Sequence, residues 1–164
     1  MKIKLLIVSM ALSGICAGQA IALTKADYDT QKSQASADYK VNRDKCGSLK
    51  NNAKDICMSE AKGTEKVAKA ELEAQYKPSA KHTRDVAMTK ADTAFDTAKQ
   101  KCDDLAGNAK DVCVKDAKAA HVKAKEDAKV AKVAADTSGN RTEKLNEAKK
   151  DASEETREAS YKVA

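Results

Sequence analysis

Residues 102–113 read CDDLAGNAKDVC, and residues 46–57 read CGSLKNNAKDIC. Each of these segments, called a clasp below, carries a cysteine at both ends. In one straight helix the two cysteines of a clasp would lie ~16.5 Å apart along the axis, whereas a disulfide needs Cα atoms within about 7 Å of each other. A bond within a clasp therefore requires the chain to reverse between its cysteines, which predicts a helical hairpin.

The residues between the cysteines favour such a reversal. Gly107 can end a helix in a left-handed conformation, Asn108 is a good N-cap for the next helix, and Asp111 can then complement the helix N-terminus. In the first clasp the same turn and capping roles are expected of Gly47, Ser48, Asn51, Asn52 and Asp55.

The four clasp cysteines can pair in three ways. We expect Cys46–Cys57 and Cys102–Cys113, each bond closing its own hairpin. The alternative is a bond between the two clasps, because folding back at Pro78 would bring Cys57 near Cys102. The sequence leaves both pairings open.

The clasps belong to a longer internal repeat. Shifted by 56 residues, the chain matches itself through both clasps, and Tyr39 falls on Phe95. A repeat of this length is typical of one supersecondary unit copied along the chain. We therefore expect a helical hairpin over 23–79, a second over 80–137, and a partial third unit over 138–164, where ASYKVA at 159–164 matches ADYKVN at 37–42.

Helix-forming residues dominate every unit. The predicted fold is all-α, with long antiparallel, coiled-coil-like hairpins pinned by disulfides. The expected helices span 25–50, 53–76, 80–106, 109–136 and 141–163. One predicted packing stripe is Met88, Ala91, Phe95, Ala98, Cys102 and Leu105, whose 3–4 spacing is that of a coiled coil. Its predicted partner is an alanine stripe that includes Ala120, Ala124 and Ala128.

The N-terminus reads as a secretory signal peptide over 1–22. Lys2 and Lys4 precede a short apolar run, and small residues at 20 and 22 favour cleavage after Ala22. Lipidation at Cys16 is the competing interpretation, and the large Ile15 before it disfavours that. Cleavage would leave four cysteines and no integral membrane segment. Even numbers of cysteines in exported chains favour disulfides.

Composition argues against several function classes. Removal of Lys2 and Lys4 would lower the formal net charge from +6 to +4. Because no aromatic or nucleic-acid motif accompanies this mild charge, no nucleic acid is expected as a partner. The clasp cysteines lack the close spacing of zinc ligands, and His82 and His121 lie far from them along the expected helices. We expect no metal, no cofactor and no catalytic residue. Asn140-Arg141-Thr142 is a formal glycosylation acceptor.

The chain is similar to a group of small exported proteobacterial proteins, rich in alanine and lysine, whose helical repeats carry the pattern YK…KC…L.GNAKDVC…AK. Such proteins are often labelled cell-envelope biogenesis proteins of TolA type. The resemblance lies in DYKVNRDKCGSLKNNAKDIC at 38–57 and CDDLAGNAKDVCVKDAKAA at 102–120. It implies a place in the cell envelope and a helical repeat architecture, and it implies no activity.

These observations predict a non-enzymatic periplasmic protein that acts as a structural or protein-interaction element, with an unknown envelope partner and an undetermined oligomeric state. The alternative is a hydrophilic stress protectant, because low hydrophobicity with high charge borders on disorder. A thiol or metal buffer is a weaker third interpretation.

Overall fold

The computed structural model describes residues 23–135 and 139–162, which form five α-helices and no strand. This confirms the predicted all-α class. The helices are α1 (Lys25–Cys46), α2 (Asn51–Tyr76), α3 (Ala80–Cys102), α4 (Gly107–Ala135) and α5 (Arg141–Tyr161). The predicted signal peptide and Cys16 lie outside the described residues.

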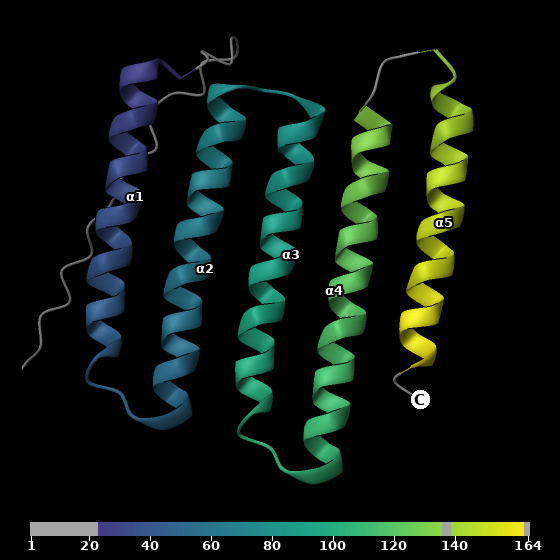
Figure 1. Ribbon diagram of the computed structural model, residues 1–164. Helices are drawn as coiled ribbons and strands as arrows, with labels where there is room; N and C mark the ends of the chain where they lie inside the picture. The colour runs from purple at the N-terminus through teal and green to yellow at the C-terminus, as the bar shows by residue number, and fades with distance from the viewer. Residues whose placement is uncertain (1–22, 136–138, 163–164) are drawn as a thin grey trace, which may run out of the picture.

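The five helices stand side by side in chain order, each antiparallel to the one before (Figure 1). Each helix packs against its sequence neighbours, and within the described ranges no contact joins helices further apart. The result is a single layer of helices. Most domains are built from at least two packed layers, whereas here no described element covers either face.

Polar caps fix where α1 and α3 begin. The hydroxyl of Thr24 accepts a hydrogen bond from the backbone N–H of Asp27 over 3.1 Å, and the hydroxyl of Ser79 accepts one from His82 over 3.1 Å. Such caps satisfy backbone donors that a helix N-terminus would otherwise leave unpaired. Pro78 stands directly before the Ser79 cap, so α2 ends and α3 begins within a few residues.

The turns at the clasps differ from the sequence prediction in where the helices end and begin and in which residues are left-handed. The first helix of each hairpin ends at the cysteine itself rather than about a turn later: α1 ends at Cys46 and α3 ends at Cys102. Gly107 is left-handed as predicted, with φ 56°, but it begins α4 instead of ending α3. The corresponding residue in the first clasp is Asn51, with φ 52°, while Gly47 is right-handed. Asparagine tolerates the left-handed region better than most residues do, so it can replace glycine there.

Small side chains form most of the core. Each helix buries one alanine, with no more than 9% of any of them exposed: Ala35, Ala61, Ala91, Ala128 and Ala152. Between α2 and α3 the backbones approach closely, since a Cβ added at Gly63 would lie 3.1 Å from the Cβ of Thr93. Dense packing of small residues therefore replaces a core of large apolar ones.

The predicted packing stripes are correct in part. Ala91, Cys102 and Ala128 are buried, but Leu105 is 43% exposed and Ala120 faces solvent. Leu105 leaves the stripe because α3 stops at Cys102, which places Leu105 in the turn. Ala120 lies outside the buried strip because α4 has neighbours on two sides and keeps its remaining surface for solvent.

Candidate functional site

The disulfides close the two clasps locally. Cys46 bonds Cys57 and Cys102 bonds Cys113, with Cα separations of 5.7 and 5.6 Å. The predicted local pairing is confirmed, and the alternative bond between Cys57 and Cys102 is wrong. In each bond the first cysteine is fully buried and the second is half-buried. The bonds therefore act inside the layer, as links between the ends of neighbouring helices.

Further contacts tie the clasp regions to their surroundings. The side-chain amide of Asn52 donates a hydrogen bond over 2.7 Å to the carbonyl of Gln100 in α3. Asn52 was predicted to help cap a helix, but it links the first clasp to the second hairpin instead. In the second clasp Lys110 reaches back to Asp103 at 2.8 Å, and this carboxylate raises the pKa of Lys110. At the clasp end, polar contacts therefore link the two helices of the second hairpin to each other and link the first hairpin to the second.

Midway along the hairpins, equivalent positions carry different chemistry. In the first hairpin the Ser36 hydroxyl donates to the Glu65 carboxylate over 3.2 Å. At the positions 56 residues later, Asp92 and His121 form a 2.6 Å contact between Oδ1 and Nε2. The His121 ring also stacks on Phe95, with ring centroids 4.6 Å apart. The second hairpin therefore has a histidine–carboxylate contact with a stacked ring where the first has a hydroxyl–carboxylate bond.

At the opposite end, a tyrosine pair links α1 to α2. The rings of Tyr28 and Tyr76 stack with centroids 4.7 Å apart, and the Tyr28 hydroxyl donates to Glu73 over 2.6 Å. This hydrogen bond, followed by the charge of Lys77, lowers the pKa of Glu73. The carboxylate is therefore held in its ionised form, and it links the two helices where no disulfide does.

The pair formed by α4 and α5 has no disulfide, and charged groups meet across it beside the buried Ala128 and Ala152. Glu126 is buried in α4 and pairs with Lys129 at 2.6 Å, and Lys129 also lies 3.8 Å from Glu155 of α5. Hydrogen bonding to Glu126, together with its negative charge, raises the pKa of Glu155. Two carboxyl groups thus meet across this interface with one lysine between them.

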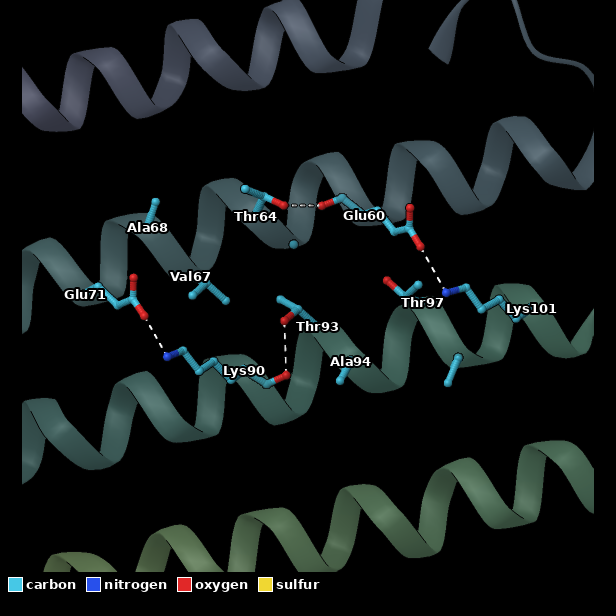
Figure 2. A pocket seen from close by; sticks show the side chains of 12 residues that line it. Glu60, Thr64, Val67, Ala68, Glu71, Lys90, Thr93, Ala94, Thr97 and Lys101 are labelled. Atoms are coloured by element: carbon cyan, nitrogen blue, oxygen red, sulfur yellow. Dashed lines mark hydrogen bonds and ion pairs between the residues drawn. The ribbon is translucent and has the colours of Figure 1, made fainter. Parts of the chain in front are cut away.

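A groove of about 780 Å³ runs between α2 and α3 on one face of the layer (Figure 2). Two ion pairs cross it: Glu60 to Lys101 at 3.0 Å, and Glu71 to Lys90 at 2.7 Å. Between them the lining consists of Gly63, Thr64, Val67, Ala68, Thr93, Ala94, Thr97 and Ala98. The groove is open and mostly apolar, and charge is confined to its two ends.

The packing stripes in the sequence do not predict this groove. The sequence does contain one indication of it. In each ion pair the acidic and the basic residue lie equally far, along the chain, from the same point, which is the start of α3 just beyond Pro78. Opposite charges at mirrored positions about a turn are what an antiparallel helix pair would bring together. The groove also depends on the rotation of each helix about its axis, and the predicted packing stripes do not define that rotation for α2.

The histidines occupy separate places. His82 contacts the carbonyl of Lys77 and the hydroxyl of Ser79 at the turn before α3, whereas His121 lies between α3 and α4. Across residues 23–135 and 139–162, no three His, Cys, Asp or Glu side chains are grouped so that they could hold a metal ion. Within the same ranges no helix combines the length and apolarity needed to span a membrane.

Asn140, the formal glycosylation acceptor, is exposed at the N-terminus of α5.

Comparison with known proteins gives no family model, no curated protein and no solved structure that matches this chain. The interpretation of the site therefore depends on the geometry of this chain itself.

Proposed function

We propose that this chain is an exported, non-enzymatic protein of the cell envelope, located in the periplasm, that acts as a structural or protein-binding element through the faces of its helical layer. One observation carries the proposal: a single layer of helices, closed by two disulfides, whose faces no described element covers. A layer of this kind presents a broad surface with little internal core. Such a surface suits contact with other macromolecules better than enclosure of a small substrate.

The placement in the envelope is supported by the N-terminal sequence and by the cysteines. Residues 1–22 have the pattern of a secretory signal, and disulfides persist in oxidising compartments such as the bacterial periplasm. The test is the N-terminus of the protein purified from fractionated cells. Leu23 in the periplasmic fraction is the expected result, and Met1 retained in the cytoplasmic fraction would contradict export.

The role of the faces is tested by cross-linking in the native envelope. A photoreactive residue at Thr64, which lines the groove between α2 and α3, is expected to capture a defined partner. The matched control places the same residue at Lys25, which is exposed at the start of α1 and lies outside the groove. Equal labelling at both positions would contradict a specific face.

A stress protectant is the second candidate, and one observation favours it. Tyr28 and Leu72 are the only large apolar side chains buried among the described residues apart from cysteine. Circular dichroism with and without reductant separates the two functions. Strong helical signal that falls on reduction is expected of a disulfide-closed structural element, whereas little helix in either state would favour the protectant.

A further inference from the structure

The groove between α2 and α3 has an ordered charge pattern. Both acidic residues that bound it, Glu60 and Glu71, belong to α2, and both basic residues, Lys90 and Lys101, belong to α3. The two ion pairs are separated by eleven residues of α2, which is ~16.5 Å along a helix. Figure 2 shows the pairs at the two ends of the groove, with the small residues between them.

The floor between the ion pairs suits close contact with another helix surface. Every lining residue there is Gly, Ala, Thr or Val, so no long side chain projects from it. Small residues allow a second set of helices to approach closely, and the area they bury is apolar. A partner on this face would also supply the second layer that most domains possess.

We propose that the partner on this face is a second copy of this chain, related by a two-fold axis that runs along the groove. Rotation about that axis leaves every residue at the same position along the direction of the helices. It places α2 of one copy on α3 of the other. Glu60 of each copy then faces Lys101 of the other, and Glu71 faces Lys90. Each acidic residue meets a basic one, so the surface is complementary to itself, as an isologous dimer requires.

The charge pattern selects this axis over the other one that would bring the two faces together. A two-fold axis across the helices would place α2 on α2 and bring Glu60 against Glu71 of the second copy. Lysines would likewise oppose lysines along α3. Like charges placed opposite each other suppress association, so only the axis along the groove gives an attractive arrangement.

This inference names the partner for the proposed protein-binding function and depends on it. The test uses two charge-reversed variants of the purified, oxidised chain. Lys90→Glu/Lys101→Glu makes all four groove charges acidic, and Glu60→Lys/Glu71→Lys makes them all basic. The intramolecular pairs lost are exposed ones, which contribute little to stability, and circular dichroism checks that each variant keeps its helix content.

Sedimentation equilibrium gives the readout. The unmodified chain is expected to be dimeric, each variant alone to dissociate at least ~100-fold more readily because its like charges repel, and an equimolar mixture of the two to form a heterodimer. The control, Lys66→Glu/Lys99→Glu, makes the same charge change on residues that do not line the groove, and it is expected to stay dimeric.

Three results would overturn the dimer: an unmodified chain that is monomeric at every concentration, a mixture that does not associate, or a control that dissociates as readily as the groove variants. A monomeric chain that still cross-links to a different envelope protein through Thr64 would reject the dimer while leaving the proposed function intact. Failure of the inference and failure of the function are thereby distinguished.

Discussion

At the clasp end, the α1–α2 hairpin and the α3–α4 hairpin are built alike, with disulfides of nearly equal Cα separation and left-handed residues at the equivalent positions Asn51 and Gly107. Midway along they differ, because Ser36 and Glu65 in the first are replaced by Asp92 and His121 in the second. The comparison indicates that the clasp defines the hairpin. The middle of each hairpin needs only some polar link between its helices, and the chemistry of that link can change.

The α4–α5 pair extends the comparison to helices that no disulfide closes. Its connecting contacts include Glu126, Lys129 and Glu155, all charged. Lys129 and Glu155 are exposed although Glu126 is buried, and ion pairs with exposed members contribute far less than a disulfide does. We therefore expect stability to decline along the layer, from the two closed hairpins to α5.

The largest effect is expected from removal of one clasp bond. Replacing Cys46 and Cys57 together with Ser should lower the free energy of unfolding by about 2–4 kcal/mol, because the unfolded chain regains the freedom that the bond removed. Denaturant unfolding followed by circular dichroism measures this loss. The same change at Cys102 and Cys113 should cost a similar amount if the two clasps are equivalent.

The single change Cys46→Ser adds a sharper test of local closure. It leaves the half-buried Cys57 unpaired, so disulfide-linked dimers should appear on non-reducing gels. In the double variant the second clasp should stay oxidised, since repeat units interact mainly with their neighbours. Peptide mapping that found Cys102 and Cys113 reduced in that variant would show that the two clasps depend on each other.

The next effect in size concerns the junction between the hairpins. Gly63→Val should destabilise the chain by about 1–3 kcal/mol, because an added Cβ alone would lie 3.1 Å from the Cβ of Thr93 and a branched side chain would overpack the interface. The matched control is Ala120→Val, at an exposed position of α4, which should change stability by less than about 0.5 kcal/mol. Equal losses in thermal or denaturant unfolding would mean that α2 and α3 are not closely packed.

That pair of substitutions also shows how far the sequence could predict the structure. The repeat follows from the match of the chain to itself after 56 residues, and the helical hairpins follow from cysteine spacing, since a straight helix cannot bring Cys102 to Cys113. The sequence favours the local bonds but leaves the pairing between the clasps open. The exposure of Ala120 does not follow, because an alanine-rich helix carries alanine on several faces and its pattern does not distinguish the buried one. Contacts with both neighbours decide which face that is.

The groove and the left-handed Asn51 were harder to predict for other physical reasons. The groove depends on the rotation of α2 and α3 relative to each other, which is set by the approach at Gly63 and Thr93 rather than by any stripe of large apolar residues. Asn51 and Gly107 are different residue types, so only their equivalent positions in the 56-residue repeat connect the two. Alignment of the clasps by backbone conformation would have found it.

A moderate effect is expected where the two hairpins differ. Asp92→Ala and His121→Ala should each lower stability by about 1 kcal/mol, and a double-mutant cycle at pH 7 should give a coupling energy of about 0.5–1.5 kcal/mol, as for a typical hydrogen bond. The variant Asp92→Ser/His121→Glu introduces the residues of the first hairpin and should recover part of the loss. A coupling energy near zero would mean that the contact between the two side chains contributes nothing.

The smallest effect is expected in the response to pH of the two ends of the layer. The pKa of Glu73 in α2 is lowered by its bond from Tyr28, so its contribution to stability is present above the ordinary value of 4.5 and is lost as the pH falls through the lowered pKa. The pKa of Glu155 in α5 is raised by Glu126. Its contribution is present below the ordinary value and is lost as the pH rises through the raised one.

The two ends of the layer should therefore respond to pH in opposite directions. The free energy of opening is measured by hydrogen exchange and corrected for the intrinsic rate. As the pH rises toward the ordinary carboxyl value of 4.5 it should rise for α1 and α2, and as the pH rises beyond that value it should fall for α5. Glu155→Gln removes the ionisation while it keeps a side chain of similar shape, so it should abolish the fall at α5 and leave the rise at α1 and α2. The control Glu147→Gln changes an exposed residue of α5 and should leave both responses as they are. A fall at α5 that persisted in Glu155→Gln would assign the pH dependence to a different group, and the contrast between closed and unclosed helices would then need another cause.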